Sequence, residues 1–272
     1  MKQLLWGLLL LSLSQNTLMA QSLHQTTMLH PVFGPYVVNY EALGGYAITE
    51  GDIVLGKSKQ LSMQAMLTRL EAQRWPKGII PYEISEYLPR ANAYAVRDAI
   101  ELWENVTEVR FVRLNERNRK QYPDYIAFVP MDGCVCASYV GRQGGRQEVL
   151  LSTRCKLMTT VHEIGHLFGL WHEQSRSDRD LYVRILWENI EKGHEYNFYQ
   201  HLTSNGDYGD YDYDSIMHYS PYAFSKNGEK TIVPLHPGVL IGQRDRLSEG
   251  DIAAVRTMYP SHDNQGDDHD LK

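Results

Sequence analysis

The chain has 272 residues, which is enough for one sizeable domain and a smaller appendage. Hydrophobic residues make up 43% of the chain and charged residues 22%, as in an ordinary soluble globular protein. The formal net charge of −6 does not suggest a nucleic-acid surface, so no nucleic-acid partner is expected. The sequence gives no indication of the oligomeric state.

Residues 1–20 have the layout of a secretory signal. Lys2 precedes an apolar run from Leu4 to Leu13, and the small residue Ala20 offers a cleavage site. A run of about ten apolar residues is too short to cross a bilayer, which needs about 20. We therefore expect a secreted protein without a membrane span.

The segment from residue 21 to residue 60 is punctuated by glycine and proline, which predicts a loop-rich region with short strands at most. Leu61 to Arg74 has the pattern of a helix, and the sequence Trp75-Pro76-Lys77-Gly78 ends it. The change at Trp75 is the best candidate for a domain boundary.

Beyond Trp75 the hydrophobic pattern alternates between strand-like and helix-like stretches. We expect, in chain order, a strand at 78–84, a helix at 91–106, strands at 109–112, 125–129 and 148–152, a helix at 158–170, long tyrosine-rich connections, and a C-terminal helix at 249–259. This mixture of strands and helices predicts an α+β domain.

A candidate metal site lies in the second of these helices. His162 and His166 are four residues apart, so they lie about 40° apart on one helix face and can bind the same zinc ion. Glu163 is next to that face and can act as a base without being a ligand. A continuing helix would carry His172 away from the metal. Gly169 can end the helix and let His172 turn back as the third ligand.

Three protein ligands leave one coordination position for water, which is typical of catalytic zinc. The sequence therefore predicts a zinc-dependent endopeptidase, in which Glu163 takes the proton of a zinc-held water as this water attacks a peptide carbonyl. Two alternatives remain open at this point: a zinc-binding interaction module without activity, and a hydrolase of non-peptide amides. The expected partner is a protein or peptide substrate.

The eleven residues from His162 to His172 match the metzincin pattern H-E-x-x-H-x-x-G-x-x-H, and their continuation, Glu173 to Asp180, resembles the astacin family of metalloendopeptidases. The downstream stretch Ser215 to Tyr219 is also similar to this family, and so are parts of 75–82, 136–147 and 182–189. The resemblance covers about Trp75 to Tyr259. It implies a two-lobed catalytic domain at 75–260 with a central active-site helix and one catalytic zinc ion, followed at 261–272 by an acidic tail expected to be disordered.

The resemblance also implies roles for residues near the metal. Met217 would form a methionine turn beneath the zinc, and Tyr219 would be a weak extra ligand that swings aside to hydrogen-bond the oxyanion. His218 would lie outside the coordination sphere. Strand 148–152 would be the edge strand on which the substrate backbone lies antiparallel.

Glu173, which follows the third ligand, would by the same resemblance meet the new N-terminus after a propeptide is removed. The alternatives for Glu173 are an exposed carboxylate or a partner for Arg176 or Arg179. That propeptide would span residues 21–74 and make the protein a zymogen, with cleavage between Leu61 and Trp75.

Astacin-like propeptides carry an F-x-G-D motif whose aspartate binds the zinc in place of water. The corresponding residues here are Thr49-Glu50-Gly51-Asp52, in which the phenylalanine is missing. Asp52 is therefore the expected latency ligand. A thiolate is also a strong zinc ligand, so Cys134 is a rival for this role.

The chain has three cysteines, Cys134, Cys136 and Cys155, so at least one has no partner within the chain. The family resemblance favours a Cys136–Cys155 disulfide and leaves Cys134 unassigned. The family's second disulfide, from an early strand to the chain end, would fall at about Glu108 and Ser261 and is missing. Its absence gives more weight to the packing of the C-terminal helix.

Overall fold

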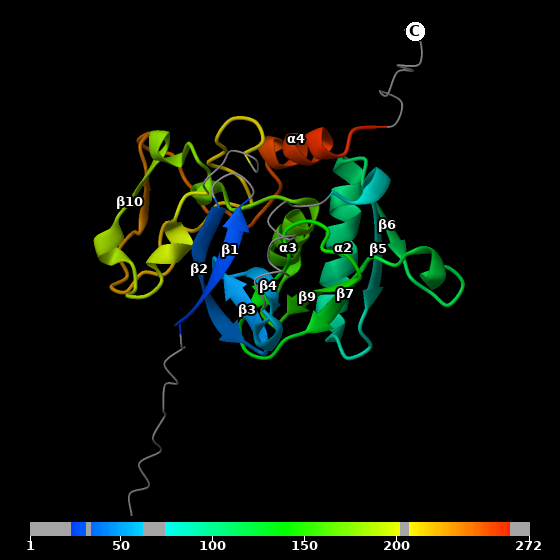
Figure 1. Cartoon of the computed structure of the whole chain (residues 1–272). Helices are drawn as coiled ribbons and strands as arrows, with labels where there is room; N and C mark the ends of the chain where they lie inside the picture. Colours follow the sequence, from blue (N-terminus) through cyan, green and yellow to red (C-terminus); the bar gives the residue numbers. More distant parts are fainter. Residues whose placement is uncertain (1–22, 31–33, 62–73, 202–206, 262–272) are drawn as a thin grey trace, which may run out of the picture.

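The structure is a computed structural model that describes residues 23–30, 34–61, 74–201 and 207–261 (Figure 1). The expected signal at 1–20, almost all of the expected helix at 61–74 and the expected tail at 261–272 lie outside the described residues. No helix in the described ranges is long and apolar enough to cross a membrane.

A five-stranded sheet forms one half of the main domain, by which we mean the described residues from 74 to 261. Its strands lie in the order β6 (Arg110–Arg113), β5 (Ile79–Ile84), β7 (Tyr125–Pro130), β9 (Arg146–Leu151) and β8 (Cys136–Ala137). Neighbouring strands are parallel except that β8 is antiparallel to β9. The strands predicted from the sequence are confirmed, with ends that differ by one or two residues.

Two helices pack beside this sheet. Helix α2 (Arg90–Val106) buries the face that carries Val96, Ala99, Ile100 and Trp103, at the three-to-four-residue spacing of a helix. Helix α3 (Leu157–Phe168) is buried all round from Thr160 onward and lies in the middle of the molecule (Figure 1). Such a helix needs neighbours on every side, and packing against them fixes its position.

Both ends of the main domain hold the last turn of α3. Trp75 Nε1 donates a hydrogen bond to Leu167 O (2.9 Å) and Tyr259 OH donates one to Phe168 O (3.0 Å), so two orphan carbonyls at the helix end are satisfied. Tyr259 follows helix α4 (Glu249–Met258), which begins with a capping box between Ser248 and Asp251. These contacts tie both ends of the main domain to the core.

The tyrosine-rich stretch after α3 is mostly turns. It contains one small antiparallel sheet, β10 (Val183–Ile185) with β11 (Ile232–Pro234). A second hydrophobic core, with Ile185, Phe198 and Tyr219 among its members, supports it. The α+β class is therefore confirmed.

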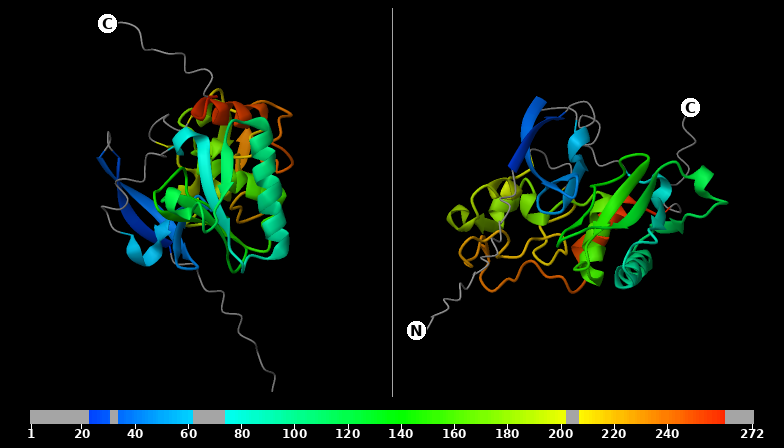
Figure 2. Two further views of the ribbon diagram at one scale, coloured as in Figure 1. Left: turned by 90° about the vertical axis from the view of Figure 1, so that its right-hand side faces the viewer. Right: turned by 90° about the horizontal axis from the view of Figure 1, so that it is seen from below.

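The expectation of a loop-rich segment at 21–60 is wrong. The described residues there form an antiparallel meander of β1 (Leu23–His30), β2 (Gly34–Leu43), β3 (Tyr46–Thr49) and β4 (Ile53–Lys57), here called the N-terminal sheet. The glycines that suggested loops lie in hairpin turns, as at Gly44 and Gly45, where φ is +54° and +85°. Figure 2 shows this sheet as a separate layer on one face of the molecule.

The N-terminal sheet attaches to the main domain along the strand edge at Ser138. Val54 N donates to Ser138 O (2.8 Å), Ser138 N donates to Asp52 O (2.9 Å), and the bridge between Ile53 and Ser138 is parallel. The predicted substrate edge at 148–152 is thus wrong in part, because β8 pairs with Leu150 and Leu151 of β9 and lies outside them. The edge next to the centre begins at Ser138, where the N-terminal sheet pairs with it.

Candidate metal centre

Helix α3 and the turn that follows it bring three histidines together. His162 and His166 lie one turn apart on α3 with ring centroids 4.8 Å apart. Gly169 ends the helix in the left-handed conformation at φ +114°, and its N–H bonds back to the carbonyls of the last turn. The chain then turns so that the His172 ring lies 4.9 Å from that of His166 and 5.5 Å from that of His162.

The outward nitrogen of each imidazole is held by a hydrogen bond, which leaves Nε2 free to face a common centre. The three Nδ1 atoms donate to separate acceptors: His162 to Ile216 O (2.9 Å), His166 to Leu170 O (2.8 Å) and His172 to Glu50 Oε2 (2.9 Å). Burial, with help from Arg244, lowers the pKa of His162 to about 3. This imidazole is therefore neutral, which is the form that binds metals.

Asp52 completes a group of four potential ligands whose atoms all lie within 4.8 Å of one another. Its Oδ2 is 3.2 Å from His162 Nε2 and 3.3 Å from His172 Nε2, and its Oδ1 is 3.6 Å from His166 Nε2. Neighbouring ligands of a tetrahedral zinc ion, each at about 2.0–2.2 Å, are about 3.3–3.6 Å apart. The spacing and the donor set therefore fit zinc.

Two buried atoms of this group also indicate a metal site, because they have no hydrogen-bond partner in the described ranges. Among the described residues, His166 Nε2 and Asp52 Oδ1 have no hydrogen-bond partner although both are shielded from solvent. Buried polar atoms are seldom left unpaired, and a metal ion at the centre would satisfy both.

The tip of the β3–β4 hairpin carries Asp52 into the centre. Thr49 pairs with Ile53, and the residues between them turn through two positive φ angles, +47° at Glu50 and +75° at Gly51. A Cβ atom on Gly51 would lie 3.0 Å from the Phe224 ring, so glycine fits here for space as well as for conformation.

Glu163 is 1% exposed, and its Oε2 has no hydrogen-bond partner in the described part of the chain. Burial, and then the nearby negative charge of Asp52, raises the pKa of Glu163 well above its ordinary value. A carboxyl group with a raised pKa next to a metal site has the properties of a proton acceptor that can later return the proton.

The stretch Ser215 to Tyr219 lies under α3. Met217 is buried, and a Cβ atom on Gly165 would come within 2.8 Å of its sulfur, so this glycine lets the methionine pack against the helix. Tyr219 OH donates to Glu50 O (2.6 Å). His218 points elsewhere, with Nε2 against Tyr211 OH (2.8 Å), and lies outside the group of four.

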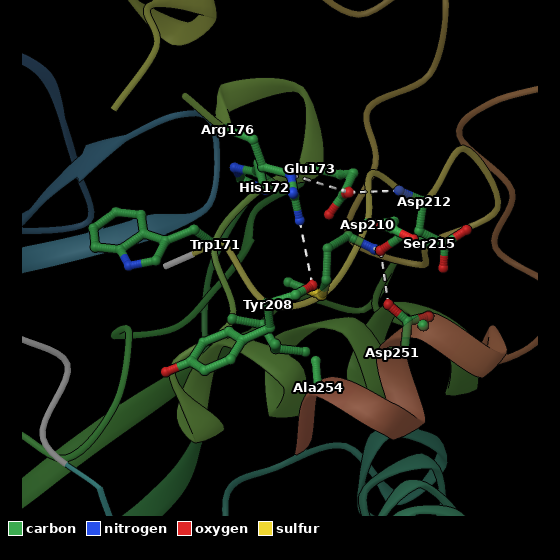
Figure 3. A pocket seen from close by; sticks show the side chains of 13 residues that line it. Trp171, His172, Glu173, Arg176, Tyr208, Asp210, Asp212, Ser215, Asp251 and Ala254 are labelled. Atoms are coloured by element: carbon green, nitrogen blue, oxygen red, sulfur yellow. Dashed lines mark hydrogen bonds and ion pairs between the residues drawn. The ribbon is translucent and has the colours of Figure 1, made fainter. Parts of the chain in front are cut away.

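Glu173 and His172 both line a cavity of about 30 Å³ (Figure 3). One of its oxygens accepts a hydrogen bond from Asp212 N (2.7 Å) and lies 3.6 Å from Arg176 Nε. Burial raises the pKa of Glu173 to about 8 although Asp212 N and Arg176 act in the opposite direction. The side chain is 13% exposed, so the alternative of an exposed carboxylate is wrong.

The structure joins Cys136 and Cys155 in a disulfide. Cys134 is exposed and does not belong to the group of four potential ligands. The geometry therefore gives no support to Cys134 as a metal ligand.

Sequence reasoning missed Glu50, Ser175 and His201. Glu50 accepts hydrogen bonds from Ser175 Oγ (3.1 Å) and His201 Nε2 (3.0 Å) as well as from His172. Burial would raise the pKa of Glu50, but His201 and His172 lower it to about 2, so the carboxylate is ionised. The one sequence signal for this role of Glu50 is its position two residues before Asp52, on the same hairpin tip.

Comparisons with known proteins agree with this geometry. A model of the peptidase family Astacin matches residues 67–260, a range that contains the three histidines and Glu163. The chain is 35% identical over 246 residues to "Zinc metalloproteinase nas-4" of Caenorhabditis elegans, covering 87% of this chain and 76% of that protein. It is 42% identical over 196 residues to "Bone morphogenetic protein 1" of Xenopus laevis, covering 68% of this chain but only 27% of that longer protein.

Among solved structures, "High choriolytic enzyme 1", a hatching enzyme zinc-protease from Oryzias latipes, is similar at 38% identity and a TM-score of 0.61. The match covers 69% of this chain and 92% of that one.

Proposed function

We propose that this chain, which belongs to the astacin family of zinc metalloendopeptidases, is a secreted, latent precursor whose N-terminal sheet occupies the zinc centre until it is removed. The astacin-like α+β fold, the endopeptidase activity and the zinc cofactor follow from membership of the family. The observation that carries the proposal of latency is the Asp52 carboxylate, which lies 3.1–3.6 Å from the Nε2 atoms of all three histidines.

In the active form, His162, His166 and His172 would hold the zinc ion. When bound, zinc supplies Lewis acidity, which polarises a peptide carbonyl and makes a water molecule more acidic. Glu163, which is buried and whose Oε2 has no hydrogen-bond partner among the described residues, takes the proton from the attacking water and passes it to the departing amine. Tyr219 OH donates to the oxyanion that forms on the carbonyl oxygen.

In the precursor these groups are engaged by the N-terminal sheet. Asp52 would be a fourth protein ligand of the zinc ion, and the Glu50 carbonyl accepts the hydrogen bond of Tyr219 OH (2.6 Å). The hairpin runs parallel to the edge at Ser138, opposite to the antiparallel direction expected of a substrate. A segment held in this direction does not present its peptide bonds for cleavage.

Cleavage between Leu61 and Trp75, for example after Arg69 or Arg74, would release the N-terminal sheet and create a new N-terminus. The cavity at Glu173 supports this step. Its volume of about 30 Å³ is enough for one or two water-sized groups, and the ammonium of a new N-terminus would find a carboxylate there. Pairing with that ammonium would stabilise the ionised form of Glu173.

Secretion is supported by the signal-like pattern at residues 1–20 and by the Cys136–Cys155 disulfide, which persists in oxidising compartments.

The test of latency compares Asp52→Ala with Cys134→Ala in the uncleaved protein. We expect Asp52→Ala to hydrolyse an unfolded protein before any cleavage, because the fourth ligand position becomes open to water. Cys134→Ala should be as inactive as the uncleaved wild type. Premature activity of Cys134→Ala alone would transfer the role of latency ligand from Asp52 to the thiol.

A further inference from the structure

The three histidines of the centre differ in what holds their outer nitrogens. His162 and His166 donate to the backbone carbonyls of Ile216 and Leu170, which belong to the main domain. His172 donates to the Glu50 carboxylate, which belongs to the N-terminal sheet. Removal of that sheet leaves the first two hydrogen bonds intact and breaks the third.

The Glu50 side chain is only 10% exposed, and its two oxygens are bound by donors of the main domain. Oε2 accepts from His172 Nδ1 (2.9 Å) and Ser175 Oγ (3.1 Å), and Oε1 accepts from His201 Nε2 (3.0 Å). The Trp171 ring packs against the His201 ring, with centroids 4.6 Å apart. The carboxylate is therefore held in one position against the imidazole.

The backbone of Glu50 lies in the left-handed region at φ +47°, which residues with a Cβ atom seldom adopt. Such a conformation persists only where the surroundings hold it. The contacts of the carboxylate and the hydrogen bond from Tyr219 OH to the Glu50 carbonyl provide this restraint.

We propose that Glu50 is a positioning residue for zinc: it orients His172 and so makes the precursor bind the metal more tightly than the cleaved enzyme does. The N-terminal sheet would then have a second function besides latency, which is to favour loading of the zinc site before cleavage. The inference rests on the proposed function in that His172 must be a zinc ligand and the N-terminal sheet must leave on cleavage.

The physical reason is the effect of a carboxylate on an imidazole that binds a metal. A carboxylate that accepts Nδ1–H fixes the tautomer and the orientation of the ring, and it makes Nε2 a stronger donor to the metal. Loss of such an outer partner typically lowers metal affinity about 10–100-fold. Asp52 acts in another way, because its oxygens face the Nε2 atoms and would touch the metal itself.

The experiment measures the zinc affinity of the uncleaved precursor by competition with a chelator. Glu50→Ala should bind zinc about 10–100-fold more weakly than the wild type. Glu50→Gln, which keeps the shape and an acceptor oxygen but loses the charge, should show a smaller loss and serves if the Ala variant does not fold. Both changes should also weaken binding in an Asp52→Ala background, where the direct ligand is absent.

The chain offers a matched control in Glu41 on strand β2. Glu41 also lies in the N-terminal sheet and pairs with a histidine of the main domain, His194 (3.1 Å), but His194 is not part of the zinc centre. Glu41→Gln should therefore loosen the sheet without changing zinc affinity by more than about twofold. An equal loss of affinity in the Glu41 and Glu50 variants would mean that docking of the sheet, and not the hydrogen bond to His172, controls metal binding.

Cobalt in place of zinc gives a second readout that does not depend on activity. The visible spectrum of the cobalt-loaded precursor should change in Glu50→Gln and remain unchanged in Glu41→Gln, because only the first variant alters the hydrogen bond to a ligand, His172. His172→Ala separates the two proposals. If His172→Ala loses zinc while Glu50→Ala and Glu50→Gln retain full affinity, the role of Glu50 is wrong and the ligand set stands. If His172→Ala keeps zinc, the ligand set itself is wrong.

Discussion

Helix α3 and the β3–β4 hairpin reach the same centre from opposite sides and are built in different ways. The helix side is local, since His162 and His166 are four residues apart and the Gly169 turn returns His172 three residues later. The hairpin side depends on long-range contacts, because Asp52 is 110 residues from His162 in the sequence. In the proposed function, the main domain would keep the first set of groups after cleavage, whereas the second set would leave with the N-terminal sheet.

This difference teaches how activity and latency can be encoded separately. The groups expected to perform hydrolysis lie in a buried helix and in the stretch beneath it, which the core holds in place. The groups expected to block hydrolysis lie on a hairpin tip, held by the edge at Ser138 and by the side chains around Glu50. Variants on the helix side should therefore lower the activity of the cleaved enzyme, whereas variants on the hairpin side should raise the activity of the uncleaved protein.

The largest effect is expected on the helix side. Glu163→Gln should lower the turnover number of the cleaved enzyme about 10²–10⁴-fold, because the proton acceptor is lost. Zinc content should remain at one ion, since Glu163 is not among the grouped ligands. Metal analysis and the rate of peptide hydrolysis check both statements. Loss of the metal in this variant would make Glu163 a ligand and would remove it from the role of base.

Tyr219 contacts both sides, and its substitution sharpens the comparison. Tyr219→Phe should lower kcat of the cleaved enzyme about 10²–10³-fold with little change in KM, since only a hydrogen bond to the transition state is lost. In the precursor the same change leaves the Glu50 carbonyl without its 2.6 Å donor. Steady-state kinetics decide the first point, and an unchanged kcat would exclude Tyr219 from oxyanion stabilisation.

A smaller effect is expected at the hairpin tip. Gly51→Ala would place a Cβ atom 3.0 Å from the Phe224 ring at φ +75°, a conformation that disfavours residues other than glycine by about 1–2 kcal/mol. The uncleaved variant should therefore be about 5–30-fold more active than the uncleaved wild type, yet less active than Asp52→Ala. Gly45→Ala is the control, because φ is +85° there and nothing lies within 4 Å of the added atom. Equal activity of the two uncleaved variants would show that the contact between Gly51 and the Phe224 ring does not maintain latency.

The smallest expected effect is a change in stability at Glu148 on β9. This carboxylate accepts a hydrogen bond from Tyr46 and forms ion pairs with Lys57 of the N-terminal sheet and Arg146 of the main domain. Burial would raise the pKa of Glu148, but these three partners lower it to about 2 from an ordinary 4.5. A lowered pKa in the folded state stabilises that state above about pH 4.5, and the contribution is lost as the pH falls toward 2. Lys57 is 45% exposed, so the gain is about 1 kcal/mol or less.

Urea denaturation of the uncleaved protein between pH 2 and pH 6 tests this point. The difference in stability between the wild type and Glu148→Gln should shrink as the pH falls. A difference that stays constant over this range would show that Glu148 is not ionised in contact with the N-terminal sheet.

The sequence predicted the helix side of the centre well because each of its signals is short. Each signal lies within one helix, strand or turn. This holds for the spacing of the histidines, for the position of Gly169 and for the hydrophobic periods of the main domain. The N-terminal sheet was missed because hairpin pairing links residues across turns, and Gly44 and Gly45 look the same in a loop and in a hairpin. Glu50 was missed for a related reason: its partners His172, Ser175 and His201 are more than 120 residues away.

The most direct test of latency compares two zinc-loaded forms of the wild type on an unfolded protein substrate, with and without chelator. One is the uncleaved protein, and the other is the form cleaved between residues 61 and 75. We predict that the uncleaved form stays at the background rate and that the cleaved form hydrolyses the substrate in a chelator-sensitive way. Equal rates for the two forms would contradict the proposal that the N-terminal sheet keeps the centre latent.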